Sequence, residues 1–209
     1  MGPHYEFERA AQSEGHFRVA GVDEVGRGPL AGPVTAAAVV LDPDCIPEGV
    51  NDSKSLGLKA RQRLAAEILA CAEVSVAHAS VAEIEELNIL RASHLAMSRA
   101  IDGLSLAPQS VLVDGNMIPR GLTLPARCIV RGDTVCLSIA AASIVAKIAR
   151  DAIMVDLAQQ HPGYGWETNM GYGSKSHISA LQNLGVTPHH RKTFRPVHNI
   201  LYQGENVTG

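Results

Sequence analysis

The chain has 209 residues and a mass of 22.1 kDa, which fits one domain with at most a small appendage. Hydrophobic residues make up 46% of it and aromatic residues only 4%, so Ala, Val, Ile and Leu must fill the core. A net charge of −3 argues against a general nucleic-acid binder, no apolar run reaches membrane-spanning length, and the first residues lack a signal-peptide pattern.

The predicted elements alternate between strands and helices after an opening hairpin, which is typical of an α/β fold with a mixed central sheet. Strands are predicted at 17–22, 33–41, 74–81, 110–114 and 126–130. Helices are predicted at 57–72, at 83–103 as one or two helices, at 138–160 and at 174–184. Residues 1–16 form a polar lead-in, loose or helical, and the segments 42–56 and 164–173 have the composition of loops.

Basic residues gather in two stretches that contain no acidic residue, 115–132 and 168–204. Such stretches in an acidic protein predict either a local site for a polyanion or a solvated basic face. The second stretch contains Lys175, Arg191, Lys192, Arg195, His177, His189, His190 and His198.

The cysteines are widely spaced and include no Cys-x-x-Cys pair. We therefore expect a reduced, cytoplasmic protein without a zinc site. The four positions are Cys45, Cys71, Cys128 and Cys136.

Acidic residues follow three of the predicted strands. Asp23 and Glu24 come after the first strand, Asp114 ends another, and Asp133 follows a third. Carboxylates gathered in one crevice repel one another, and a divalent cation offsets that repulsion. Oxygen ligands favour Mg²⁺ or Mn²⁺ over zinc, and two ions about 3.5–4 Å apart are the usual device for phosphodiester displacement. The alternative is that these acids are solvated strand ends or turn caps.

A glycine turn, Gly26-Arg27-Gly28, comes directly after the first acidic pair. Glycines let backbone N–H groups approach a ligand closely, and an arginine between them suits a phosphate. The ordinary alternative is a simple turn.

Six ordered motifs resemble bacterial type 2 ribonuclease H (ribonuclease HII) over about 17–197. They are Asp23-Glu24-Val-Gly26-Arg27-Gly28, Asn51-Asp52-Ser53-Lys54, Val113-Asp114-Gly115-Asn116 with Gly132-Asp133, Ser138 to Asp151, His161-Pro162-x-Tyr164-Gly165 and Gly171-Tyr172-Gly173. The resemblance implies a ribonuclease H-like α/β fold, a mixed five-stranded sheet flanked by helices, with a helical C-terminal extension. It divides the chain into a lead-in (1–16), a catalytic domain (17–160) and an extension that contributes to substrate binding (161–209).

The resemblance also implies an activity. The enzyme would cleave the RNA strand of RNA/DNA hybrids and incise duplex DNA on the 5′ side of single embedded ribonucleotides, leaving 3′-hydroxyl and 5′-phosphate ends. Two divalent ions, Mg²⁺ or Mn²⁺, would be held by the catalytic set Asp23, Glu24, Asp114 and Asp133, with Asp23 best placed to touch both. We expect a monomer with no membrane association.

Further residues are candidates for contact with the substrate. The backbone at Gly26 and Gly28 would sense the ribose 2′-hydroxyl, Arg27 would hold a phosphate, and Tyr172 would stack on the following deoxyribose. Phosphate contacts are expected from Asn51, Lys54, Ser143 and Lys147. Alternatively, Ser143 and Lys147 merely share a helix face, and Tyr172 merely anchors its loop.

The chain departs from the family pattern before Tyr172, where Thr168-Asn169-Met170 replaces the His-Lys of many relatives and removes a positive charge. His161 is expected to be structural, and the pair His189-His190 to belong to the basic surface. The rival function is a non-catalytic nucleic-acid-binding module, which leaves the acids unexplained. A nucleotide-binding enzyme and a serine hydrolase are weaker alternatives, because neither a P-loop nor a Gly-x-Ser-x-Gly elbow occurs.

Overall fold

Five strands form one mixed sheet in the order β3-β2-β1-β4-β5. The computed structural model describes residues 2–202, so the end of the predicted extension, 203–209, lies outside the described residues. The predicted mixed five-stranded sheet is confirmed. The strands are β1 (Val19–Val25), β2 (Val34–Leu41), β3 (Ala72–Ala79), β4 (Ser110–Asp114) and β5 (Ala126–Ile129).

Strand direction brings three carboxyl ends to the same edge of the sheet. β1 runs parallel to β4, and β4 runs parallel to β5, whereas β2 pairs antiparallel with both β1 and β3. The register places Val22 opposite Val113, so Asp23 and Asp114 are the next residues on neighbouring strands. β1 continues to Val25, so Asp23 and Glu24 lie within the strand rather than after it.

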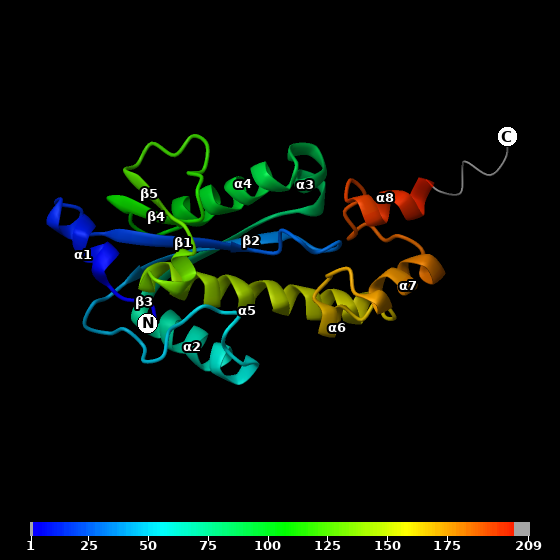
Figure 1. Cartoon of the computed structure of the whole chain (residues 1–209), viewed down its shortest axis with the longest axis horizontal. Helices are drawn as coiled ribbons and strands as arrows, with labels where there is room; N and C mark the ends of the chain where they lie inside the picture. The colour runs from blue at the N-terminus through cyan, green and yellow to red at the C-terminus, as the bar shows by residue number, and fades with distance from the viewer. Residues whose placement is uncertain (1, 203–209) are drawn as a thin grey trace.

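Helices cover both faces of the sheet (Figure 1). On one face, α3 (Val81–Leu87) and α4 (Ile89–Asp102) pack on the central strands, and on the other lie α2 (Leu58–Cys71) and α5 (Leu137–Gln160). The region predicted as one or two helices is two, because Asn88 has a positive φ of 67° and its side chain caps α4.

The N-terminal helix α1 (Glu6–Ser13) secures the start of α5. Glu8 is buried, and its carboxylate accepts hydrogen bonds from the Ser138 backbone N–H (2.8 Å) and hydroxyl (2.6 Å). A carboxylate at this position satisfies free N–H groups of the first turn. Gly21 of β1 lets α5 approach closely, because a Cβ there would overlap the Ser138 backbone. The lead-in therefore helps to position the segment that carries Asp133.

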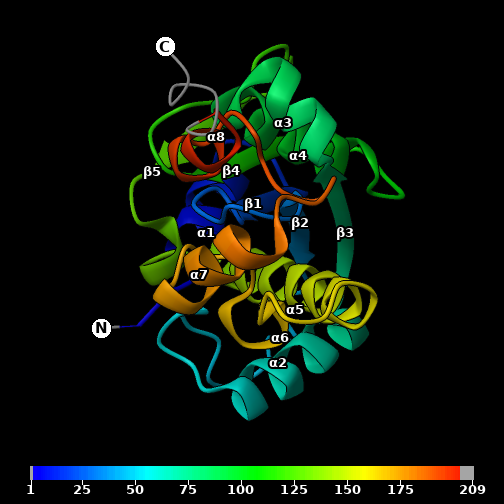
Figure 2. The same cartoon turned by 90° about the vertical axis from the view of Figure 1, so that its right-hand side faces the viewer.

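Three short helices follow α5 and pack at its C-terminal end (Figure 2). They are α6 (Trp166–Asn169), α7 (Lys175–Leu184) and α8 (Arg195–Tyr202). The helix predicted at 174–184 is confirmed, whereas α6 was expected to be loop and α8 was not predicted. α6 has only four residues, too few to produce a periodic pattern. α8 has Pro196 in its first turn, where proline is tolerated because that N–H has no helical partner.

The expectation that all four cysteines are reduced is wrong for two of them. Cys45 and Cys71 form a disulfide, with their Cα atoms 5.6 Å apart. Cys128 and Cys136 are free. The spacing of 26 residues gave no hint of the bond, because only the fold brings the loop after β2 to the end of α2. Among the described helices, none is both long and apolar enough to cross a membrane.

A carboxylate at the opposite end of the sheet allows a test of stability against pH. Burial alone would raise the pKa of Glu73, but hydrogen bonds from Arg18, Ser105 and Leu106 outweigh it and lower that pKa to about 2. A lowered native pKa stabilises the fold above the unfolded pKa of about 4.3, and the contribution is lost as the pH falls towards 2. Glu73→Gln should therefore lower the free energy of unfolding by about 1 kcal/mol at pH 7, and by progressively less below pH 4.

Urea unfolding of the two proteins at pH 7, 5 and 3 measures this difference. Glu86→Gln, which changes an exposed carboxylate of α3, is the matched control and should show little difference at any pH. A deficit of Glu73→Gln that stays constant from pH 7 to pH 3 would contradict the assignment.

Candidate active site

Four predicted acids lie at the edge formed by the carboxyl ends of β1 and β4. Successive strand residues face opposite sides of a sheet, so Asp23 faces the α5 side while Glu24 faces α4. Asp114 ends β4, and Asp133 lies in the short 3-10 turn Gly132–Thr134 before α5. Asp23 and Asp133 are buried, at 6% and 7% exposure.

The carboxylates are close enough to perturb one another. Burial raises the pKa of Asp23 well above its ordinary value, and the charges of Glu24, Asp114 and Asp133 raise it further. Burial and then Asp133 also raise the pKa of Asp114. Burial raises the pKa of Glu24, although Arg27 opposes that shift. Neighbouring positive charge would stabilise the ionised form of every one of these groups.

Each carboxylate also has a partner within the protein. Asp23 accepts a hydrogen bond from the Glu24 N–H (2.7 Å), and Asp114 accepts one from the Gly132 N–H (2.7 Å). Glu24 pairs with Arg27 at 3.1 Å, and Asp133 pairs with Lys54 at 3.2 Å.

The acids do not form a closed set of ligands in the described part of the chain. Among residues 2–202, no group of three or more His, Cys, Asp or Glu side chains stands in a geometry ready to hold a metal ion. The donor set is nonetheless the kind a hard divalent cation selects, since it consists of carboxylate oxygens whose repulsion such an ion relieves.

The glycine turn adjoins this edge and depends on its glycines. Gly26 has a φ of +95°, and a Cβ there would overlap the side chain of Arg150. A Cβ on Gly28 would lie 3.4 Å from the ring of Tyr172. The glycine turn and the Tyr172 ring are therefore neighbours.

Two fully buried arginines hold the turn from behind. Arg191 donates to the carbonyl oxygens of Gly26 (2.6 Å), Arg27 (2.9 Å) and Gly32 (2.9 Å). Arg150 donates to the carbonyls of Pro33 (2.9 Å), Ala31 (3.0 Å) and Met170 (3.0 Å). Burial lowers the pKa of Arg191 to about 9 and that of Arg150 to about 10.

Sequence reasoning missed this role of the arginines. Arg191 was counted with the basic surface, which is wrong because its side chain is 0% exposed. Arg150 was noted only as part of the Ser138 to Asp151 motif, without a role of its own. A cation whose partners are backbone carbonyls leaves no acidic residue in the sequence to reveal it.

A buried hydrogen-bonded network supports the loop of Tyr172. The Trp166 Nε1–H donates to His177 Nε2 (3.0 Å), which lies 3.1 Å from His190 Nε2. His177 Nδ1 lies 2.9 Å from the carbonyl oxygen of Tyr172, and His190 Nδ1 accepts from the Thr187 N–H at 3.0 Å. Burial lowers the pKa of both histidines, to about 3 for His190. The assignment of His190 to the basic surface is therefore wrong.

The segment Thr168-Asn169-Met170 has a structural role. Asn169 accepts a hydrogen bond from the Gly171 N–H (2.8 Å) and donates one to the Tyr164 carbonyl (2.8 Å). Its carbonyl oxygen also accepts from the Tyr172 N–H at 2.9 Å. Asn169 thus shapes the turn that presents Tyr172, whose ring is 46% exposed.

The other predicted contacts surround the carboxylates. Ser143 is buried, and its hydroxyl accepts from the Ser53 N–H at 3.3 Å, so it ties the loop of Lys54 to α5. Lys147 is half-buried and pairs with Asp151 at 2.6 Å on the same helix. Asn51 caps its own turn by accepting from the Asp52 N–H.

The mixed sheet and its acidic edge define a nuclease of the ribonuclease H-like class. The family model described as Ribonuclease HII matches residues 20–199. The chain therefore belongs to the ribonuclease HII family, and it is a metal-dependent endoribonuclease.

Several known proteins are similar over nearly the whole chain. The ribonuclease HII of Roseobacter denitrificans is 72% identical over 193 residues, covering 92% of this chain and 98% of the relative. That of Cereibacter sphaeroides is 66% identical over 206 residues, or 99% and 97% of the two chains. The crystal structure of ribonuclease H2 from Pyrococcus horikoshii, 26% identical, has a TM-score of 0.76 and covers 91% of this chain and 100% of its own.

Arg191 provides a test of how the turn is held. Arg191→Lys keeps the charge but removes the fork of donors that reaches three carbonyls. Because a misplacement of about 1 Å can cost about a hundredfold in rate, we expect the single-turnover cleavage rate of an RNA/DNA hybrid to fall at least about tenfold. Lys192→Arg, a charge-conserving change at the exposed neighbour, should cleave like the parent. Equal rates for Arg191→Lys and the parent would show that the turn does not depend on Arg191.

Proposed function

We propose that this endoribonuclease hydrolyses the RNA strand of RNA/DNA hybrids and incises duplex DNA on the 5′ side of single embedded ribonucleotides. The products would carry 3′-hydroxyl and 5′-phosphate ends. The observation that carries the proposal is a buried carboxylate, Asp23, that lies among three other acids beside the glycine turn. This pairing supplies a reaction centre next to a surface that can recognise ribose.

The four acids would hold the metal. Asp23 is the most buried and is influenced by each of the other three, so it would contact both of two ions, with Glu24, Asp114 and Asp133 completing the ligands. Bound Mg²⁺ or Mn²⁺ lowers the pKa of a coordinated water and stabilises negative charge on the phosphate. Lys54 would move from Asp133 towards a substrate phosphate once the ions neutralise that acid, since its side chain is 80% exposed.

The glycine turn would distinguish RNA from DNA. A 2′-hydroxyl both donates and accepts hydrogen bonds, and backbone groups at Gly26 and Gly28 would bind it because glycine has no side chain of its own. Of the two residues, Gly28 is exposed and Gly26 is buried. Arg27, which is half exposed, would hold the adjoining phosphate. Tyr172 packs against Gly28 and would stack on the sugar of the next deoxynucleotide, which favours an RNA-to-DNA junction.

The remaining contacts would fix the backbone on the α5 side. Ser143 and Asn51 shape the loop of Lys54, and Lys147 would share its charge between Asp151 and a phosphate. We propose that the enzyme acts as a monomer, and we propose the cytoplasm as its compartment.

The competing function is a nucleic-acid-binding module without catalysis. Such a module requires no cluster of mutually repelling carboxylates, and burying that cluster costs stability in either case. Turnover that depends on a metal separates the two functions.

Asp23→Asn tests the proposed function. With Mg²⁺ and a DNA duplex that contains one ribonucleotide, we expect the parent to cut on the 5′ side of that ribonucleotide. The variant should cut at least about a hundredfold more slowly while still binding the duplex, because it loses a charged ligand in a water-poor site. Asp102→Asn, at the exposed end of α4, is the matched control and should cut like the parent. Cleavage by Asp23→Asn at the parental rate, or parental cleavage that survives chelation of the metal, would falsify the proposal.

A further inference from the structure

A hollow of about 320 Å³ lies along α4, beside the proposed active site. The residues that line this hollow, named here the α4 groove, are Arg91, His94, Leu95, Ser98 and Arg120. Arg91, Leu95 and Ser98 are spaced i, i+4 and i+7, so they share one face of α4. Arg120 comes from the connection between β4 and β5, directly after the buried Pro119. Two elements far apart in the chain therefore place an arginine each on one concave surface.

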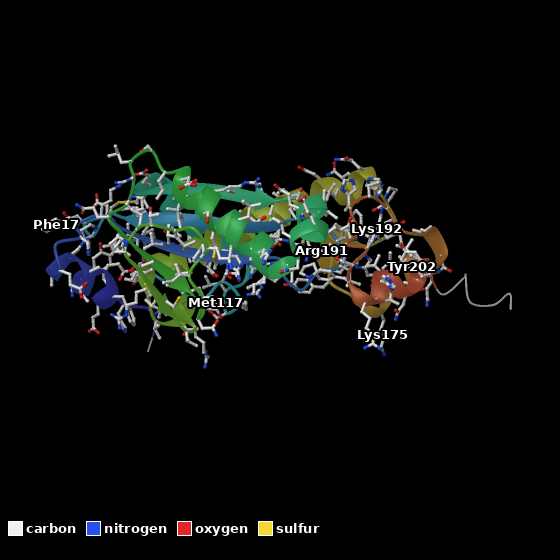
Figure 3. The ribbon with its side chains drawn as sticks, turned by 90° about the horizontal axis from the view of Figure 1, so that it is seen from above. Phe17, Met117, Lys175, Arg191, Lys192 and Tyr202 are labelled. Atoms are coloured by element: carbon white, nitrogen blue, oxygen red, sulfur yellow. A yellow bond between two sulfur atoms is a disulfide. The ribbon has the colours of Figure 1, made fainter. Side chains whose placement is uncertain are left out.

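The α4 groove is continuous with the active-site edge. His94 lines it and also lines a second hollow of about 120 Å³, whose walls include Glu24, Arg27 and Asp114. Met117, which lines this second hollow, lies between the Phe17 end of the molecule and the C-terminal helices (Figure 3). A chain-like ligand that passes the carboxylates can therefore continue past His94 into the α4 groove.

The charge of the α4 groove is unpaired. No acidic side chain lines it, and in the part of the chain that the structure describes neither Arg91 nor Arg120 forms an ion pair. Other arginines are paired, such as Arg63 with Glu67 on α2 (2.8 Å) and Arg99 with Glu83 (2.6 Å). Two free guanidinium groups in a concavity form a site for anions, with a geometry that matches phosphate oxygens.

His94 adds a neutral donor to this surface. It is 8% exposed, and burial lowers its pKa, with the charges of Arg27 and Arg120 lowering it further. Both arginines are therefore within electrostatic reach of one imidazole. The arrangement forms a row of cations, from Arg27 at the glycine turn past His94 to Arg120.

We propose that the α4 groove binds backbone phosphates of the cleaved strand on the 5′ side of the scissile bond. The inference rests on the proposed function and adds a subsite to it. Tyr172 touches the glycine turn from the C-terminal helices and would take the sugar on the 3′ side. His94 lines both the hollow that includes Glu24, Arg27 and Asp114 and the α4 groove, so a strand held at Tyr172 that crosses the carboxylates can continue into that groove.

The test combines a double variant with neutralised phosphates. In Arg91→Ala/Arg120→Ala, single-turnover cleavage of a duplex with one ribonucleotide should need roughly tenfold more enzyme for half-maximal rate, with the maximal rate unchanged. The slope of log affinity against log salt should shrink by about 1.5–2. Arg9→Ala/Arg63→Ala, which removes two charges from α1 and α2, is the matched control and should change neither quantity.

Substrates with a neutral methylphosphonate at one linkage identify the strand and the side. Neutralising a linkage 5′ of the cut should weaken binding by the parent but not weaken binding by the double variant any further. The subsite is overturned if the two losses multiply, or if coupling appears only with linkages 3′ of the cut or on the complementary strand. If the parent fails to cut at all, the proposed function fails. If the parent cuts and the double variant binds equally well, only the subsite fails.

Discussion

The structure is organised around negative charge that the fold concentrates at one edge of its sheet. Parallel pairing of β1 with β4 puts Asp23 level with Asp114, and the start of α5 adds Asp133 from the same side. Burial and mutual repulsion raise the pKa of Asp23, so this edge is unfavourable in the free protein. Close packing elsewhere stabilises the fold against this repulsion. Gly21 lets α5 pack closely on β1, and Glu8 accepts hydrogen bonds at the first turn of α5. The acids are thus held by backbone elements rather than by flexible loops.

Positive charge is buried directly behind this edge, and it acts on the backbone. Arg150 and Arg191 use their donors on carbonyl oxygens of the glycine turn and the segment after it. With those carbonyls bound, the turn has less freedom to present its N–H groups in another direction. The same arginines stay charged without a carboxylate partner, so the positive field of the turn is not cancelled locally. Under the proposed function, ribose recognition and phosphate recognition would both depend on one buried scaffold.

Much of this site was predictable from sequence because its chemistry is local. Asp23-Glu24 followed by Gly-Arg-Gly, and strands that end in Asp114 or lead to Asp133, suffice to indicate an acidic edge. Burial was harder to predict, since a basic residue in an acid-free stretch is usually on the surface. Arg191 and His190 are core residues because carbonyls and rings from distant segments surround them. The break at Asn88 and the Cys45–Cys71 bond depend on similar tertiary contacts.

The loop before Tyr172 affects which parts of the protein would supply affinity for the substrate and which would supply selectivity. Asn169 folds the loop before Tyr172, and under the proposed function Tyr172 would offer stacking and shape without an adjacent cation. Electrostatic affinity would then come from elsewhere, and Arg91 and Arg120 of the α4 groove, which form no ion pair among the described residues, would supply it. Affinity that depends on phosphates upstream of the cut leaves the downstream contacts free to select the junction. In this chain Arg91 and Arg120 of the α4 groove would supply affinity for phosphates, and Tyr172 would select the RNA-to-DNA junction.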